Sequence, residues 1–194
     1  MKILMFSTDR NVFRANSEAR KRMEEYGELF EALHVVVFTN KKEGFKHSRA
    51  SGKVFIYPAN YLSKVLFLCR SFYLGRAIIK REKITAVTCQ DPFESGLAGW
   101  LLAKIHRLPL QLQVHTDVFS SYFAAESFKN KIRVLTAGFL LPRVNGIRVV
   151  SERIKQSIIN KYPRLERKIT VLSIYVDVKK IKSGKIKVDL SIIQ

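Results

Sequence analysis

The chain has 194 residues, 47% of them hydrophobic, which is enough for the core of one domain with at most a fragment of a second. Thirty-five lysines and arginines stand against sixteen aspartates and glutamates, so the formal net charge at pH 7 is +19. The sequence shows no internal repeat and no low-complexity segment, and its apolar content is normal for a globular protein. Its charge indicates an anionic partner, such as nucleic acid, a lipid surface or a phosphorylated ligand.

The cysteines and the hydropathy pattern indicate where the protein works. Cys69 and Cys89 each lie in an apolar run, which favours buried, reduced thiols in a cytoplasmic protein over a disulfide. No run of about 18 apolar residues is present, and residues 1–7 are too short for a secretion signal. We therefore expect a soluble, cytoplasmic protein that can attach peripherally to the inner face of the cell membrane.

The first half of the chain alternates short apolar runs with amphipathic segments. The pattern predicts strand, helix, strand, strand, helix and strand over residues 3–6, 17–30, 34–38, 54–57, 61–81 and 85–89. A basic, glycine-containing loop is expected over residues 40–52. The long helix is expected to pack through an apolar stripe formed by Leu62, Val65, Leu66, Phe72, Tyr73 and Ile79.

The second half continues the alternation. It predicts helix, strand, helix, strand, helix and strand over residues 93–106, 110–114, 126–141, 146–150, 151–160 and 169–172. Strands that alternate with helices at this spacing form a parallel sheet through right-handed crossovers. The predicted fold class is therefore α/β, a Rossmann-like parallel sheet of about seven strands with helices on both faces.

Polar side chains follow four of the predicted strands, where a parallel sheet opens into its ligand-binding crevice. They are Asp9, Arg10, Arg14, Asp91, His115, Thr116, Asp117, Ser151 and Glu152. Structural roles are available for several of them: Asp91 precedes a proline as turn openers do, Ser151 suits a helix N-cap, and His115 suits a half-buried strand end. Their shared position at one sheet edge nevertheless favours a binding site.

Familiar catalytic motifs are absent from the sequence. There is no Gly-x-x-x-x-Gly-Lys phosphate loop, no Gly-x-Gly-x-x-Gly after the first strand and no Gly-x-Ser-x-Gly elbow. The four histidines and two cysteines lack metal-ligand spacing. We therefore expect no metal and no cofactor, and the sequence argues against a self-contained dehydrogenase, kinase or hydrolase.

Five features in this order resemble the amino-terminal domain of a family 4 glycosyltransferase with the GT-B fold. They are the first strand Met-Lys-Ile-Leu-Met-Phe-Ser, Asp91-Pro92 before a Gly-x-x-Gly helix, a strand ending in His115-Thr116-Asp117, the run Val149 to Ile154, and Tyr175-Val176-Asp177-Val178. The resemblance implies two Rossmann-like domains facing each other across the active site. The amino-terminal domain then binds the acceptor, and the carboxy-terminal domain holds the nucleotide-sugar donor.

The resemblance also implies a retaining, metal-free sugar transfer through an oxocarbenium-like transition state, to a saccharide or lipid-linked acceptor of the kind used in cell-envelope polysaccharide or glycolipid synthesis. His115 matches the histidine that faces the donor sugar and the reacting centre. Thr116 and Asp117 would orient it or touch the acceptor. Ser151 and Glu152 match the pair that opens the helix facing the cleft.

Two departures from the family pattern matter. The loop after the first strand lacks the usual glycine pair, so Arg10 or Arg14 would supply the charge for the donor diphosphate instead of backbone amides. We also expect that these 194 residues do not include the family's second domain. We therefore expect residues 1–178 to form the acceptor-side domain, residues 179–194 to be a linker and the start of a truncated second domain, and the chain to be inactive without that domain in the same or another chain.

The basic residues of the long helix, Arg70, Arg76, Lys80 and Arg81, leave three interpretations open. They form a solvated cationic face, or they bind an anionic lipid surface, as suits lysine- and arginine-flanked apolar helices. Nucleic-acid binding is less favoured, because neither a basic groove with exposed aromatics nor a known module is present. The alternative to a glycosyltransferase is thus a non-catalytic, basic Rossmann-like module that binds anionic surfaces or nucleic acid.

Overall fold

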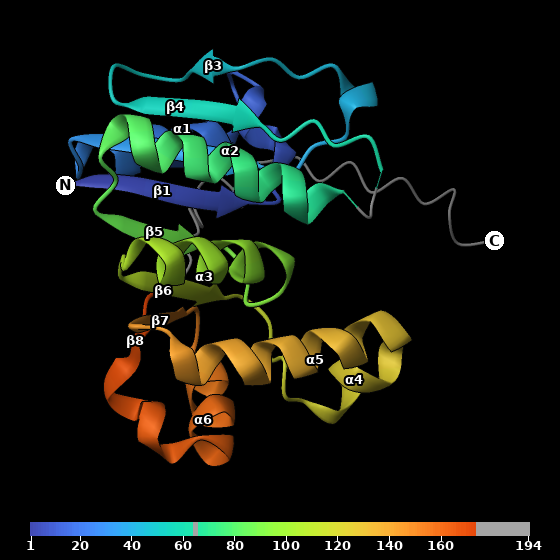
Figure 1. Ribbon diagram of the computed structural model, residues 1–194. Coiled ribbons are helices and arrows are strands. Elements are labelled where there is room, and N and C mark those ends of the chain that lie inside the picture. Colours follow the sequence, from blue (N-terminus) through green and yellow to red (C-terminus); the bar gives the residue numbers. More distant parts are fainter. Residues whose placement is uncertain (64–65, 174–194) are drawn as a thin grey trace, which may run out of the picture.

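The computed structural model describes residues 1–63 and 66–173 and shows one sheet with helices on both faces (Figure 1). The strands are β1 (Lys2–Ser7), β2 (Ala32–Val37), β3 (Ser48–Arg49), β4 (Val54–Pro58), β5 (Ala86–Cys89), β6 (Leu110–Val114), β7 (Gly146–Val149) and β8 (Ile169–Val171). They lie in the order β3-β4-β2-β1-β5-β6-β7-β8. Only the β3–β4 pair is antiparallel within the described sheet. The predicted α/β, Rossmann-like class is confirmed.

Helices divide unequally between the two faces of the sheet. The described helices are α1 (Glu18–Glu28), α2 (Phe67–Glu82), α3 (Glu94–His106), α4 (Ser121–Glu126), α5 (Phe128–Leu140) and α6 (Glu152–Lys161), with short 3-10 turns η1 (Arg10–Phe13), η2 (Lys41–Glu43), η3 (Leu141–Arg143) and η4 (Pro163–Lys168). Helix α1 covers a smaller core over β1, β2 and β4. Helices α2, α3, α5 and α6 share the larger core on the opposite face.

The prediction of one helix over residues 61–81 is wrong at its start. Helix α2 begins at Phe67, because the backbone of Tyr61 is paired elsewhere: its amide donates to Thr39 O at 3.0 Å, and its carbonyl accepts from Lys41 N at 3.0 Å. Asn60 before it has a positive φ of 47°, which turns the chain. Three members of the predicted apolar stripe, Leu62, Leu66 and Tyr73, are exposed. Val65 lies outside the described residues.

Three further expectations need correction. The basic loop at 40–52 contains the edge strand β3, whose backbone pairs with β4. The helix predicted over 126–141 is interrupted at Ser127, which is extended and caps α5 by accepting from Asn130 N. Cys69 is exposed on the outer side of α2, whereas Cys89 is buried as expected. The boundary at residue 178 and the tail at 179–194 lie outside the described residues and stay predictions.

The chain changes direction across the sheet at β1. From β1 it steps to β2 on one side, and it returns to place β5 on the other side of β1. The ends of β1 and β5 are joined by Ser7 Oγ, which donates a 2.5 Å hydrogen bond to Gln90 Oε1. Such a switch point opens a crevice outside the carboxyl ends of parallel strands.

Helix α3 approaches the sheet so closely that it requires glycine. A Cβ at Gly99 would collide with the sulfur of Cys89 on β5, and one at Gly96 would lie 2.8 Å from the carbonyl oxygen of Asp91. The Gly-x-x-Gly spacing seen in the sequence thus sets how near α3 lies to the strand end that carries Asp91.

We predict that Gly99→Ala lowers the free energy of unfolding by about 1–3 kcal/mol, because the added methyl overpacks a buried contact. Gly52→Ala is the matched control, since a Cβ there meets open space and the change should be nearly neutral. Urea denaturation of both variants measures the difference. Equal stability of the two variants would contradict the close approach of α3.

His34 is buried inside the larger core. It lies in β2, 1% exposed, with Nδ1 3.0 Å from the hydroxyl of Tyr57 and its ring stacked on Phe55 at 5.0 Å. Burial lowers the pKa of His34 below its ordinary value of 6.5; Glu82 opposes that shift and Arg81 adds to it. The histidine is therefore neutral in the folded protein at pH 7.

Because the folded pKa of His34 lies below the unfolded value, the unfolded chain binds its proton more readily. The stability that depends on neutral His34 is present above pH 6.5 and is lost as the pH falls below it. We predict that His34→Gln flattens the fall of unfolding free energy between pH 7 and pH 5. Urea titrations at each pH measure the slope, and an unchanged slope in His34→Gln would refute the assignment.

Candidate functional site

The ends of β1, β5, β6 and β7 form a continuous edge. These four strands are neighbours in the sheet, and strands lie about 4.8 Å apart, so their ends span about 14 Å. Along this edge the structure places Asp9, Asp91, His115 and Ser151 in that order, each just after its strand. The expected convergence of polar groups on one sheet edge is therefore present.

His115 follows β6 directly and stands open to solvent. Partial burial of its ring nevertheless lowers the pKa of His115, and the positive charges of Arg148 and Arg22 lower the pKa further. A histidine whose pKa is below 6.5 is neutral at pH 7. Its imidazole can then donate one hydrogen bond and accept another, which suits contact with a sugar hydroxyl.

Arg22 and Arg148 were not recognised from the sequence. Arg148 lies in β7 beside Gln113 of β6, and Arg22 lies in α1. Because Ile147 and Val149 face the larger core, alternation along β7 turns Arg148 toward the face covered by α1. The sequence did contain one indication of a role for Arg148, because it is the one charged residue in the strand predicted at 146–150.

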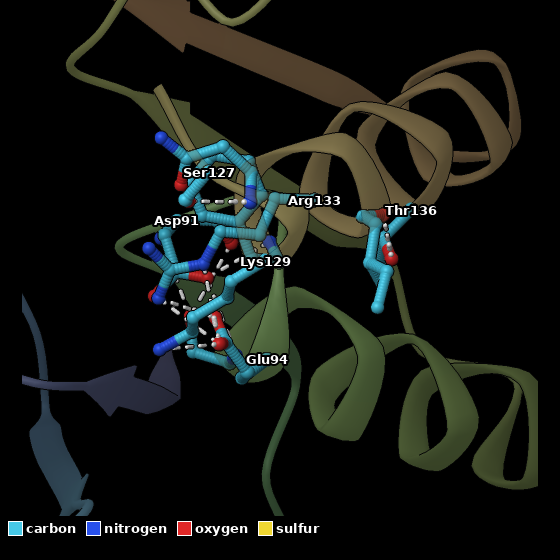
Figure 2. Close-up of polar contacts among 10 residues, drawn as sticks. Asp91, Glu94, Ser127, Lys129, Arg133 and Thr136 are labelled. Carbon is cyan, nitrogen blue, oxygen red and sulfur yellow. Dashed lines mark hydrogen bonds and ion pairs between the residues drawn. The ribbon is translucent and has the colours of Figure 1, made fainter. Parts of the chain in front are cut away.

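Asp91 is held in a structural role at the start of α3 (Figure 2). Its Oδ1 accepts from the amides of Phe93 at 2.8 Å and Ser95 at 3.3 Å. Burial raises the pKa of Asp91, while the hydrogen bonds from Ser95 and Phe93 hold it down. The Asp91 carboxylate therefore stabilises the turn after β5, and its Oδ1 is already occupied by two amides.

Asp117 and Thr116 differ in how firmly they are held. Asp117 Oδ1 accepts a 2.6 Å hydrogen bond from Ser157 of α6, and its carbonyl accepts from the hydroxyl of Ser120 at 3.0 Å. Asp117 therefore fixes the loop after β6 against α6. Thr116 is exposed beside His115, and its side chain has no hydrogen bond within the described residues.

The Ser-Glu pair opens α6 as expected, and its two members are in different environments. Ser151 is the N-cap, with its side chain accepting from Ile154 N at 3.4 Å. Glu152 is exposed and lies 3.7 Å from Lys155 Nζ, an ion pair of little energetic weight at the surface. Glu152 is thus the more available of the two at the strand-end edge.

The loop after β1 contains the two arginines expected to meet a diphosphate. Arg10 Nε lies 3.1 Å from Glu43 and 3.4 Å from the carbonyl of Phe38, so its charge is already paired. Asp9 caps η1 by accepting from Asn11 N. Arg14 is exposed and has no ion pair within residues 1–63 and 66–173. Of the two arginines, Arg14 is the one available to an anion.

A shallow hollow of about 690 Å³ lies beside the loop after β6. It is lined by Asp117, Phe119, Arg153, Gln156, Ser157, Asn160 and Lys161. Lys161 Nζ stands 4.4 Å above the ring of Phe119. In the described part of the chain, no group of three or more His, Cys, Asp or Glu side chains is placed to hold a metal ion.

Residues 26–180 match the family model described as Glycosyltransferase Family 4. The chain belongs to glycosyltransferase family 4. The matched segment covers most of the sheet and the strand-end residues from Asp91 to Glu152, whereas the loop after β1 precedes it. A search of curated protein sequences finds no match.

Solved structures confirm the fold of this family 4 chain as the amino-terminal half of GT-B. Sucrose-phosphate synthase from Thermosynechococcus elongatus aligns over 92% of this chain and 49% of its own, with 10% identity and a TM-score of 0.71. A shorter chain of that enzyme aligns over 93% of both chains, with 12% identity and a TM-score of 0.67.

A second kind of enzyme shares the fold. UDP-GlcNAc 2-epimerase from Neisseria meningitidis, bound to UDP-GlcNAc, aligns over 88% of this chain and 45% of its own, with 12% identity and a TM-score of 0.60. The family 4 chain therefore spans about half the length of the longer enzymes it resembles.

We predict that Asp91→Ala lowers the free energy of unfolding by about 1–2 kcal/mol, because two amide hydrogen bonds at the start of α3 are lost. Asp91→Asn keeps an acceptor oxygen and should lose less. Thermal denaturation of the two variants measures the difference. A fully stable Asp91→Ala variant would contradict this structural role and return Asp91 to the candidate ligands.

Proposed function

We propose that the chain is the acceptor-side half of a retaining glycosyltransferase that moves a sugar from a nucleotide-sugar donor to a saccharide or lipid-linked acceptor. The observation that carries this proposal is the position of His115, exposed at the end of β6 with a lowered pKa. A neutral imidazole, exposed at a strand end near the switch point of a family 4 domain, suits hydrogen bonding to the transferred sugar. As the sugar gains oxocarbenium character, a neutral ring avoids placing positive charge beside it.

Positive charge near His115 suits a nucleotide-sugar diphosphate. Arg22 and Arg148 lie close enough to His115 to lower its pKa, and Arg14 is exposed on the loop after β1. Guanidinium groups match the geometry of phosphate oxygens. The epimerase bound to UDP-GlcNAc, which shares this fold, supports a uridine nucleotide as the first donor to test. The proposal requires neither a metal nor a cofactor.

The proposed reaction needs a second domain. The chain covers about half of the longer enzymes that share its fold, and we propose that its strand-end edge forms one wall of a cleft between two domains. We propose that the donor is held mainly by a carboxy-terminal domain in the same or another polypeptide. We also propose that the protein works in the cytoplasm, attached peripherally to the inner face of the cell membrane.

A non-catalytic, basic binding module is the second candidate. It is favoured because the polar groups of three strand ends make contacts within the fold: Asp91 accepts from two amides at the start of α3, Asp117 accepts from Ser157, and Ser151 caps α6. If these contacts are the only roles of the strand ends, the +19 charge becomes the main feature to explain. The ligand would then be an anionic surface or a nucleic acid.

A transfer assay separates the two candidates. The chain would be joined to a GT-B carboxy-terminal domain and supplied with UDP-glucose and a panel of saccharide and lipid-linked acceptors, with UDP release as the measurement. We predict that His115→Ala lowers turnover about 100-fold or more, because a polar contact to the transition state is lost. Its folding should be nearly unchanged, since the side chain is solvent-exposed.

Thr116→Ala, at the neighbouring exposed position, is the matched control and should retain most activity. An His115→Ala variant that unfolds would support a structural histidine. A folded His115→Ala variant with full activity would remove His115 from the site. Absence of transfer with every acceptor, combined with tight and steeply salt-dependent binding to DNA, would favour the binding module.

A further inference from the structure

Helix α5 exposes an apolar stripe. Its members, Phe128, Ile132, Leu135 and Phe139, follow each other at spacings of four, three and four residues, so they lie along one side of the helix. They are 77%, 50%, 73% and 40% exposed. A contiguous stripe of this kind marks an interaction surface, whereas single exposed apolar residues need no explanation.

Contacts on the other side of α5 fix this orientation (Figure 2). Arg133 donates to both carboxylate oxygens of Glu94 on α3, at 2.9 and 3.0 Å, and its guanidinium lies 5.0 Å from the ring centre of Phe93. Ala137 and Leu140 are fully buried. Turning the stripe inward would break the Arg133–Glu94 pair. The fold therefore keeps the stripe exposed.

The apolar surface extends beyond α5. Leu101 and Ile105 on the outer side of α3 are exposed, and so is Tyr122 on α4. Trp100 of α3 packs edge-on against Phe139 at 5.0 Å, which joins the two helices into one surface. We call this surface, made of the outward side chains of α3, α4 and α5, the α3–α5 face.

Cations border the α3–α5 face, and the carboxylates near it are occupied. Lys131 lies beside the stripe without an ion pair in the described residues. Lys104 stands 5.1 Å over the Trp100 ring and Arg143 4.1 Å over the Phe139 ring. Glu94 is paired with Arg133, and Glu126 accepts a hydrogen bond from the side chain of Asn130. An apolar centre with aromatic rings and a cationic rim complements an anionic lipid surface.

We propose that the α3–α5 face docks on an anionic lipid bilayer, with α5 lying in the plane of the interface. The proposal rests on the proposed function, because it supplies the surface from which a lipid-linked acceptor would enter. It differs from the sequence-based assignment to the helix at 61–81. Helix α2 adds the exposed charges Arg70, Arg76 and Lys80 beside the exposed ring of Tyr73, while Arg81 pairs with Glu82. None of the helices in the described ranges is long and apolar enough to cross a bilayer.

Position and charge favour this occupant over a second copy of the chain. The α3–α5 face begins at α4, which lies on the side of the molecule toward which the strands point (Figure 1). An acceptor leaving the bilayer there would reach the strand-end edge without crossing the molecule. A second copy would instead bring two cationic rims together on chains that each carry +19.

The test is sedimentation of the 194-residue chain with vesicles of phosphatidylcholine alone or mixed with phosphatidylglycerol. We predict binding to the anionic vesicles only, weakened about 10-fold by Leu135→Gln, since one buried apolar side chain is lost from the interface. Leu29→Gln is the matched control: Leu29 is 75% exposed, close to the 73% of Leu135, but it lies at the end of α1 on the opposite face. It should bind like the wild type.

Each outcome decides the proposal. Equal binding by the two leucine variants, or no vesicle binding by the wild type, would overturn it. So would concentration-dependent dimerisation that Leu135→Gln abolishes while vesicles are ignored, because a second copy would then cover the face. Unchanged melting temperatures would show that neither substitution unfolds the chain. Vesicle binding needs no sugar transfer, so this result stands apart from the His115 assay.

Discussion

The pairing of β1 with β2 on one side and β5 on the other determines the rest of the structure. Because crossovers between parallel strands are right-handed, a chain that first moves to one side and then to the other must place its helices on opposite faces. The same reversal separates the loops that follow β1 and β5, and Ser7 and Gln90 hold the two strand ends together across it. The place where the loops after β1 and β5 diverge is thus a consequence of topology.

That division of helices gives the two faces different properties. On the face of α1, Arg22 and Arg148 bring positive charge near His115 and help to keep its ring neutral. On the opposite face, α5 is tied to α3 through Arg133 and Glu94 and leaves its apolar side exposed. The proposed sugar-transfer site and the proposed lipid-docking face therefore depend on different residues. Helix α4 is the part of the α3–α5 face that lies toward the strand-end edge.

Much of the fold could be predicted because apolar alternation and N-caps are local signals. They located every strand of the sheet except β3, a two-residue edge strand whose pairing depends on β4. The start of α2 could not be predicted. The apolar spacing of a helix continues back to Tyr61, but the backbone of Tyr61 pairs with Thr39 and Lys41. The break at Ser127 was likewise hidden in a continuous amphipathic pattern.

The candidate site was predictable in position and less so in detail. Strand ends identified His115, but the charges of Arg22 and Arg148 that act on it come from elements distant in sequence. The sequence predicted a helix at 126–141 without showing which side of it is buried, since that depends on the contact of Arg133 with Glu94 of α3. Contacts between elements decide such questions, and no local pattern contains them.

Ligands are expected to meet this domain at the strand-end edge around His115. An amide NMR titration of the chain with UDP-glucose and a saccharide acceptor can test this directly. We expect chemical-shift changes in the loops after β1, β5, β6 and β7, together with a change in the His115 ring signals. Shift changes confined to other surfaces, or none at saturating ligand, would contradict it.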